Sequence, residues 1–379
     1  MSPSPIPICI ILGTRPEAIK LAPVIRLFRQ DPDFETQVVL TGQHREMVTQ
    51  VMTLFDLDAD VDLDIMQQQQ TLTDITCRTL RGLERVFEQQ RPRLVLVQGD
   101  TTTAFAATLA ALYQKIPVGH VEAGLRTDQL MDPYPEEANR RLVSQIARLH
   151  FAPTAQAVQN LHRSGVSEQV HQTGNTVIDA LLTVAASHPP CDVGGLDWSR
   201  YRVLLSTVHR RENWGAPLKA IAQGLHRIVE DHPDVALLLP LHRNPTVREP
   251  LQDILGGHSR IFLTEPLNYA ALVGAIQRCY LLLTDSGGLQ EEAPSLGKPV
   301  LVLRETTERG EAITAGTAKL IGTDVERIVQ ETQLLLEDDA LYTKMATAIN
   351  PFGDGNAAQR ILALVKQFFG AETAADSLQ

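Results

Sequence analysis

Short apolar runs that end in small, charged or hydroxyl residues recur seven times along this 379-residue chain. The seven endings lie at residues 13–17, 41–44, 98–100, 120–124, 207–211, 284–288 and 304–309. Open parallel sheets bind ligands outside the carboxyl ends of their strands, where successive strand-to-helix loops converge. One such loop is weak evidence, whereas seven together predict a ligand site built from strand-to-loop junctions.

The order of strand-like and helix-like patterns predicts two successive α/β series. The β-rich runs of the first series lie at 6–12, 37–40, 94–97, 116–121 and 149–152, and those of the second at 202–208, 235–239, 261–263, 281–284, 299–303 and 320–321. Helical patterns such as 72–87 and 101–113 separate the runs. Strands that alternate with crossover helices pair in parallel, so we expect two α/β domains with parallel sheets.

The domain boundary is predicted near Gly174. Residues 187–195 have no apolar period and are rich in glycine and proline, which is typical of a connector or surface loop. We therefore assign residues 1–174 to a first domain and 175–356 to a second. A final helix, expected at about 357–369, could pack on either domain.

Composition excludes several classes of protein. A chain with 44% hydrophobic and 21% charged residues is an ordinary globular chain, and its net charge of −11 argues against nonspecific binding to nucleic acid or to an anionic membrane. The four cysteines show no paired spacing, so neither a metal site nor a disulfide framework is expected. The N-terminus lacks a basic region and the run at 6–12 is too short for a signal core, so we expect a cytoplasmic protein.

The turn at 13–17 is the first candidate phosphate site. It follows the first strand and opens a helix, so its backbone amides would face an anion, and Arg15 and Lys20 would add positive charge. Ordinary helix capping with solvated charges is the alternative. The chain has neither a G-x-G-x-x-G fingerprint nor a Walker lysine loop, so neither a nicotinamide enzyme nor a P-loop nucleotidase is favoured.

The second domain repeats this phosphate pattern at a diglycine. Ser286, Gly287 and Gly288 end a strand and open a helix, which lets a ligand approach the backbone. Glu292 lies one turn later and could accept hydrogen bonds from the vicinal hydroxyls of a ribose; its alternative role is to complement the helix dipole. His209 and Arg309 also follow strands and could contact phosphates, with surface ion pairs as the competing explanation for the neighbouring charges.

Three carboxylates stand at strand ends and a helix start in the first domain: Asp100, Glu122 and Glu136. Any one of them could simply cap a helix. Three acids on one cleft rim instead favour proton transfer, because phosphate groups on one wall and titratable acids near a sugar suit acid–base chemistry on a nucleotide sugar.

Seven longer motifs occur in order along the chain. They are GTRPEAIK (13–20), QGDTTT (98–103), HVEAGLRT (120–127), PYPEEANRR (133–141), GNTVID (174–179), VHRREN (208–213) and DSGGLQEEAPSLG (285–297). Together they resemble the non-hydrolysing UDP-N-acetylglucosamine 2-epimerases over nearly the whole chain. The resemblance implies a GT-B fold, in which two Rossmann-like doubly wound parallel-sheet domains face a central cleft, with the helix of segment 357–379 packing back on the first domain.

The resemblance also implies an activity. The family interconverts UDP-N-acetylglucosamine and UDP-N-acetylmannosamine without a cofactor or metal, by eliminating UDP to a 2-acetamidoglucal and adding it back. By resemblance, Asp100, Glu122, Glu136 and His209 form the catalytic set. The substrate contacts that it implies are Arg15, Lys20, Arg140, Ser286, Gly287, Gly288, Glu292 and Arg309.

The resemblance further implies a homodimer and, in many bacterial members, activation by a second UDP-N-acetylglucosamine. The matching positions are Gln43, Gln70, Arg210 and His242. Glu46 and Gln69 stand where activated relatives carry glutamine and arginine, and Gly310 stands where the family commonly has proline. The contacts that Glu46 and Gln69 replace would therefore be missing for an activator.

Three other functions remain open at this point. A UDP-dependent glycosyltransferase would share the diglycine and Glu292 but would need an acceptor. A hydrolysing epimerase would release free N-acetylmannosamine, and a silent UDP-sugar sensor would need no acids. As an epimerase, the protein would supply a precursor for surface polysaccharide.

Overall fold

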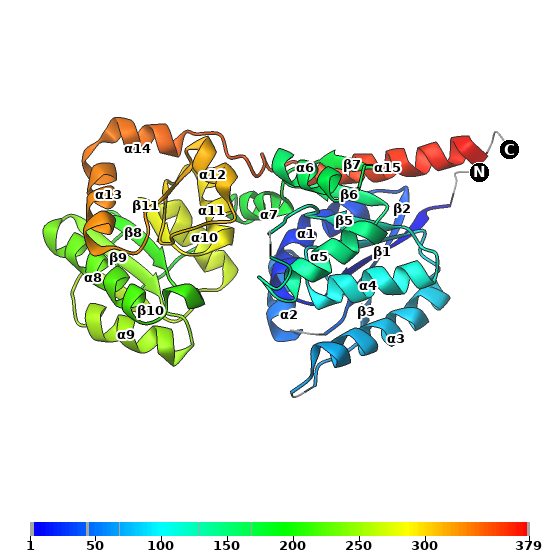
Figure 1. The fold of residues 1–379 in the computed structure, drawn as a ribbon, viewed down its shortest axis with the longest axis horizontal. Coiled ribbons are helices and arrows are strands. Elements are labelled where there is room, and N and C mark those ends of the chain that lie inside the picture. The colour runs from blue at the N-terminus through cyan, green and yellow to red at the C-terminus, as the bar shows by residue number, and fades with distance from the viewer. Residues whose placement is uncertain (1–3, 43–44, 68, 128, 168, 377–379) are drawn as a thin grey trace. The chain divides into compact units, whose positions relative to one another are not determined.

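The computed structural model describes residues 4–376 except 43, 44, 68, 128 and 168 (Figure 1). The chain divides into two compact units. Unit 1 comprises Met1–Ala180 and Phe352–Gln379, and unit 2 comprises Leu181–Pro351. Both units are α/β, as the alternating patterns predict.

Unit 1 contains a seven-stranded parallel sheet in the order β3-β2-β1-β4-β5-β6-β7. Its strands are β1 (Ile6–Leu12), β2 (Phe34–Leu40), β3 (Val61–Asp62), β4 (Leu94–Gln98), β5 (Val118–Val121), β6 (Leu149–Ala152) and β7 (Val170–Gln172). Its helices are α1 (Arg15–Gln30), α2 (Arg45–Leu54), α3 (Leu72–Gln90), α4 (Thr102–Tyr113), α5 (Glu136–Ile146), α6 (Ala155–Arg163), α7 (Thr176–Ala185) and α15 (Ala357–Asp376). The division between the units falls within α7.

Helices cover both faces of this sheet, which explains why its central strands are apolar along their whole length. All five residues of β4 are buried. On one face, Cys9 and Ile11 of β1 share a core with α3 and the alanine-rich α4. On the other, α1 packs against β1 and β2. The edge strands β3 and β7 are short and only partly buried, and their sequences do not form apolar runs.

Helix α15 packs against α1, with further contacts at its start and at Phe369. Asp179 of α7 accepts hydrogen bonds from the backbone N–H groups of Ala357 and Ala358. Near the other end, the Phe369 ring lies 6.3 Å from the Phe34 ring, between centroids. The last helix therefore belongs to the same compact body as the first.

Unit 2 contains a six-stranded parallel sheet in the order β10-β9-β8-β11-β12-β13. Its strands are β8 (Arg202–Thr207), β9 (Val235–Pro240), β10 (Ile261–Thr264), β11 (Leu281–Thr284), β12 (Val300–Val302) and β13 (Ala318–Leu320). Its α-helices are α8 (Ala216–Asp231), α9 (Pro245–Leu255), α10 (Tyr269–Arg278), α11 (Gly287–Glu292), α12 (Gly310–Ala315), α13 (Val325–Glu337) and α14 (Asp339–Ala346), with 3₁₀ turns at Arg211–Asn213 and Ala293–Leu296. One continuous apolar core holds β8, β9 and β11 against α8, α9 and α13.

Each sheet has one topological switch point, the position where the strand order reverses. In unit 1 it lies between β1 and β4, and in unit 2 between β8 and β11. Ligands of doubly wound sheets bind beyond the carboxyl ends of the two strands at such a point. The loops that follow these four strands are therefore where a site is expected. No helix within the described ranges is long and apolar enough to cross a membrane.

Candidate functional site

The connections that follow the strands at the two switch points carry several of the residues predicted from the sequence. In unit 1, Arg15 follows β1 and Asp100 follows β4, with Glu122 after the neighbouring β5. In unit 2, His209 follows β8 and Ser286 follows β11. Each of these residues therefore lies just beyond the carboxyl end of a strand.

The N-terminus of α1 binds its own glutamate. The Gly13 and Thr14 N–H groups donate to Oε2 of Glu17 over 2.9 and 2.7 Å, and the Thr101 hydroxyl donates to Oε1. Glu17 is fully buried, and that burial raises its pKa. The expectation that these two amides face an anion is wrong, because the carboxylate of the capping box already occupies them.

The two cations near this turn behave differently. Arg15 is half-buried, and its guanidinium has no hydrogen-bond or ion-pair partner in the described ranges. Lys20, in contrast, donates from Nζ to both carboxylate oxygens of Glu122, over 2.6 and 2.7 Å. In this structure Arg15 is thus available to an anion, whereas the charge of Lys20 is committed to a predicted catalytic acid.

Glu122 is a buried carboxylate surrounded by donors. Its side chain is 4% exposed, and besides Lys20 it accepts hydrogen bonds from the amide groups of Gln98 and, over 3.0 Å, Asn175. Its backbone φ of 64° lies in the left-handed region, which is costly for a residue with a Cβ. The fold thus holds the Glu122 carboxylate in one position at the expense of backbone strain.

Asp100 is paired with Arg140, which the sequence analysis placed among the substrate contacts. Arg140 donates from Nε, over 3.1 Å, and from Nη2 to Oδ2 of Asp100. Its remaining nitrogen, Nη1, reaches the fully buried Glu137 over 3.0 Å, and Asn139 donates to the Asp100 carbonyl. Helix α5 therefore orients Asp100 through two consecutive residues.

Glu136, the first residue of α5, is the third acid. It is half-buried, and its carboxylate has no hydrogen-bond or ion-pair partner among the described residues. Asp100 and Glu122, in contrast, each contact a cation. The three predicted acids therefore lie in three distinct electrostatic settings.

In unit 2, one buried aspartate organises the loop after β8. The Asp285 carboxylate is inaccessible to solvent and accepts from the N–H groups of His209 and Arg210, over 2.9 and 2.8 Å, and from Nδ2 of Asn213, over 3.0 Å. The His209 Nδ1 atom lies 3.2 Å from Oδ1 of the same group. Asp285 therefore links the β8 loop to the diglycine that follows β11.

Two arginines flank the diglycine. A Cβ added at Gly287 would lie 3.4 Å from Nη2 of Arg210 and 3.5 Å from Cζ of Arg309. Arg309 also donates from Nε to Glu291 over 2.6 Å, whereas the Arg210 Nε is buried with no partner in the described part of the chain. A phosphate that approached the Gly287 backbone would therefore meet two guanidinium groups.

Glu292, the predicted ribose ligand, is largely buried beside Gly288 and Tyr269. Its Oε1 lies 3.3 Å from the Cβ that Gly288 lacks, and the Tyr269 hydroxyl donates to Oε2 over 3.4 Å. Ser286 donates its N–H to the Thr284 hydroxyl over 2.9 Å. The carboxylate therefore lies against the diglycine, as the one-turn spacing predicts.

The four predicted activator contacts lie in different places. In unit 2, the His242 ring stacks on His209 with centroids 6.0 Å apart, and Arg210 lies over Gly287, so both adjoin the predicted substrate contacts. Gln70 is in unit 1, where its side-chain oxygen accepts from the N–H of Gln67. Gln43 lies outside the described residues.

Several residues of these clusters were missed by the sequence analysis. Asp285, Asn175 and Gln98 all lie inside the quoted motifs, directly beside glycines or residues of predicted function. A signal for Gln98 and Asp285 was the position of each at the end of a predicted strand, whereas Asn175 follows β7, which was not predicted. Tyr269 had no such signal, because it begins α10, far from any motif.

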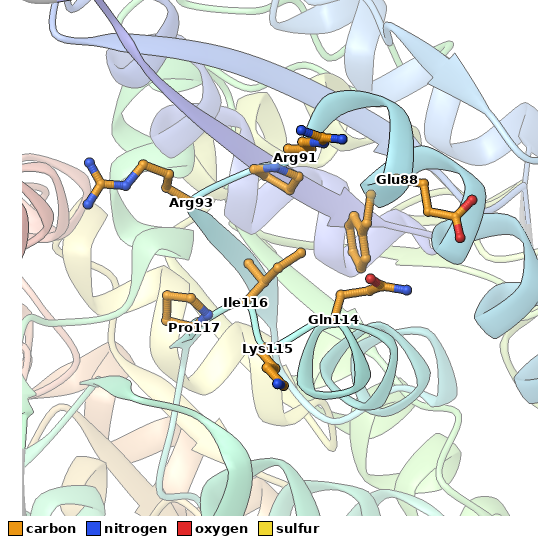
Figure 2. Close-up of a pocket in the computed structure, with 9 residues that line it drawn as sticks. Glu88, Arg91, Arg93, Gln114, Lys115, Ile116 and Pro117 are labelled. Carbon is orange, nitrogen blue, oxygen red and sulfur yellow. The ribbon is translucent and has the colours of Figure 1, made fainter.

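The hollow shown in Figure 2 lies elsewhere. It encloses about 610 Å³ and is lined by Phe87, Glu88, Arg91, Pro92, Arg93, Gln114, Lys115, Ile116 and Pro117. These residues come from the end of α3 and from the connections that lead into β4 and β5, at the amino ends of those strands. Because the predicted acids follow the carboxyl ends, this hollow is not part of the candidate site. In the described residues, no group of three His, Cys, Asp or Glu side chains is placed to hold a metal ion.

Known proteins resemble the chain over almost its whole length. The family model described as UDP-N-acetylglucosamine 2-epimerase matches residues 26–366. The UDP-N-acetylglucosamine 2-epimerase of Escherichia coli K12 is 50% identical over 371 residues, which cover 94% of this chain and 97% of that protein.

Solved structures agree with this match. A putative UDP-N-acetylglucosamine 2-epimerase from Listeria monocytogenes superposes with a TM-score of 0.90 at 46% identity, covering 97% of each chain. The Neisseria meningitidis UDP-GlcNAc 2-epimerase bound to UDP-GlcNAc gives a TM-score of 0.87 at 45% identity, covering 96% of this chain and all of that one.

Proposed function

The chain belongs to the UDP-N-acetylglucosamine 2-epimerase family, and from this premise we propose that it interconverts UDP-N-acetylglucosamine and UDP-N-acetylmannosamine by inverting C2 of the sugar. The observation that carries the proposal is the distribution of charge at the two switch points. Carboxylates lie near the switch point of unit 1. Guanidinium groups lie beside the diglycine at the switch point of unit 2.

The reaction requires both kinds of group because the C2 hydrogen of the sugar is barely acidic. A base removes the C2 proton while the C2–H electron pair forms the C1–C2 double bond. The C1–O bond breaks, and its electron pair passes to the β-phosphate oxygen of UDP. Protonation of the glycal at the opposite face of C2, with return of the UDP oxygen to C1, gives the epimer. The route needs no redox cofactor, because elimination and readdition are redox-neutral overall.

Unit 1 would supply the proton transfers through Asp100, Glu122 and Glu136. Asp100 and Glu122 are held in fixed orientations by Arg140 and Lys20, which suits groups that must face one carbon atom. Glu136 has no such restraint in the described part of the chain. These three act as one catalytic set.

Unit 2 would bind the UDP moiety. Arg309 and His209 would stabilise the diphosphate as it departs, since fixed cations at the position where charge develops favour the transition state. Glu292 would accept hydrogen bonds from the ribose hydroxyls. Arg15 of unit 1, whose guanidinium has no hydrogen-bond or ion-pair partner within the described ranges, would be a further phosphate-binding residue.

We further propose a cytoplasmic homodimer whose product supplies surface polysaccharide synthesis. Activation by a second UDP-N-acetylglucosamine would act through Arg210 and His242. Because these residues adjoin Gly287 and His209, the activator would lie next to the substrate diphosphate.

Incubation with UDP-N-acetylglucosamine alone in deuterated water tests the proposal. An epimerase incorporates deuterium at C2, keeps UDP attached and forms UDP-N-acetylmannosamine. Accumulation of UDP and free sugar would instead identify a hydrolase, and an unchanged sugar would favour a transferase that lacks its acceptor or a sensor.

Variants connect the activity to the proposed residues. We expect Asp100→Asn to abolish deuterium incorporation while UDP binding persists, and Glu292→Ala mainly to weaken UDP binding. Glu88→Gln, in the hollow of Figure 2, is the matched control and should exchange at the rate of the unaltered protein. Undiminished exchange in Asp100→Asn would remove Asp100 from the catalytic set.

A further inference from the structure

Asp285 has one more polar contact than a loop anchor needs. It lies between β11 and the diglycine, is inaccessible to solvent, and already binds two backbone N–H groups and the Asn213 amide. Those three donors suffice to fix the loop after β8. The fourth group, His209 Nδ1 at 3.2 Å from Oδ1, contributes little to that purpose, because the backbone of His209 is already bound.

The other ring nitrogen of His209 is not engaged by a polar group of the described residues. Its Nε2 atom has no hydrogen-bond partner in the described ranges, and the side chain is 38% exposed. A neutral imidazole has one N–H and one lone pair, and which nitrogen carries the hydrogen is set by the partner of the other. A carboxylate can only accept, so the short distance between Nδ1 and Asp285 favours the tautomer with its hydrogen on Nδ1.

We propose that Asp285 is a positioning residue for His209: by accepting the Nδ1 hydrogen, it makes Nε2 the nitrogen that takes up a proton and donates it in a hydrogen bond to the diphosphate. The last part of this inference rests on the proposed function. Its first part, the choice of tautomer, concerns the protein without substrate.

Charges around the ring fit this role. Arg210 of the same loop, His242 after β9 and Arg304 after β12 oppose a positive charge on His209, and burial is the largest cause that lowers its pKa. Asp285 acts in the opposite direction. Arg304 is itself paired with Glu212 and Glu308. The balance favours a neutral ring at rest.

Arrival of the diphosphate would change that balance. Its negative charge beside Nε2 favours the imidazolium, which Asp285 stabilises from the other side of the ring. The ring takes this proton from solvent. During elimination, the Nε2–H group donates to the β-phosphate oxygen that receives the C1–O electron pair, and it gives up this hydrogen bond on readdition.

The tautomer can be measured directly in the unaltered protein by ¹⁵N NMR of labelled imidazoles. Comparison with His209→Gln identifies the His209 signals. The inference requires a neutral ring with hydrogen on Nδ1 in the absence of ligand, and a doubly protonated ring when UDP is bound at neutral pH. Hydrogen on Nε2 in the free protein would overturn it. This measurement needs no turnover. The tautomer inference can therefore be wrong while the epimerase proposal holds, and the epimerase proposal can be wrong while the tautomer inference holds.

Kinetics separate a positioning role from a purely structural one. Asp285→Asn should lower kcat at least about tenfold and shift the pH profile to lower pH, because the imidazolium loses its carboxylate. Asn213→Ala is the matched control, since it removes another donor to Asp285 without touching the ring. Equal losses with unshifted pH profiles in the two variants would show that Asp285 only anchors the loop. If Asp285→Asn does not fold, the NMR measurement decides alone.

Discussion

The contact between Lys20 and Glu122 predicts a large coupling energy. The two groups lie 2.6 and 2.7 Å apart, and their side chains are 19% and 4% exposed. With an effective dielectric constant of about 20, the Coulomb attraction is on the order of 6 kcal/mol, and desolvation of the two ions offsets a large part of it. We therefore expect a net coupling of about 3 kcal/mol.

A double-mutant cycle measures this coupling. The variants are Lys20→Met, Glu122→Gln and the double variant, each unfolded in urea and followed by circular dichroism. Lys20→Met should lower the unfolding free energy by about 3 kcal/mol, at the low end for a broken buried pair, because Gln98 and Asn175 still bind the carboxylate.

An exposed pair in the same unit provides the control. Arg29 and Asp60 lie 2.7 Å apart with side chains 28% and 43% exposed, so their cycle should give no more than about 1 kcal/mol. If the Lys20–Glu122 coupling were below about 0.5 kcal/mol, or equal to that of the control pair, the conclusion that the fold commits Lys20 to this acid would be wrong.

Two further predictions concern the buried histidines of unit 1 and the diglycine of unit 2. Burial lowers the pKa of His120 and of His150 to about 4, so as the pH falls from 6.5 towards 4 the unfolded chain takes up protons that the folded chain does not, and stability is lost in that window. Each histidine should cost about 2 kcal/mol between pH 6.5 and 5, and the urea midpoint of His150→Gln should depend less on pH; the same pH dependence as in the unaltered protein would contradict this. Gly287→Ala should raise the Kd for UDP about tenfold in calorimetry without affecting folding, because the methyl group fits against Arg309 but fills the phosphate approach. Gly310→Ala, with open space at its Cβ, is the control, and equal effects of the two changes would refute the assignment.

The sequence was sufficient for the architecture because apolar strands and amphipathic helices repeat along it. The two parallel α/β sheets are confirmed, and the switch points fall at the loops that the motifs single out. The edge strands β3 and β7 were missed, because pairs at the rim of a sheet need only two or three residues and bury little of them. The pattern of hydrophobicity carries no signal for such strands.

The ion pairs of the candidate site could not be predicted from the sequence. Asp100 meets Arg140 and Lys20 meets Glu122 across separations of 40 and 102 residues, and only the register of the sheet brings them together. Arg140 was assigned to substrate for this reason. The hydrogen bonds from the Gly13 and Thr14 N–H groups to Glu17, in contrast, could have been predicted. A threonine followed three residues later by a glutamate is the sequence pattern of a capping box.

The hydrogen bond between Asn175 and Phe352 bears on whether unit 1 can be produced without unit 2. The Asn175 N–H donates to the Phe352 carbonyl over 2.6 Å, and Gly174 packs on Gly353 at the same place. The chain therefore re-enters unit 1 beside the start of α7, the helix through which it left, so that unit 2 is an insertion between two nearby segments of unit 1. Unit 2 can therefore be deleted and the two cut ends of unit 1 joined by a short peptide. This makes unit 1 a candidate for independent expression.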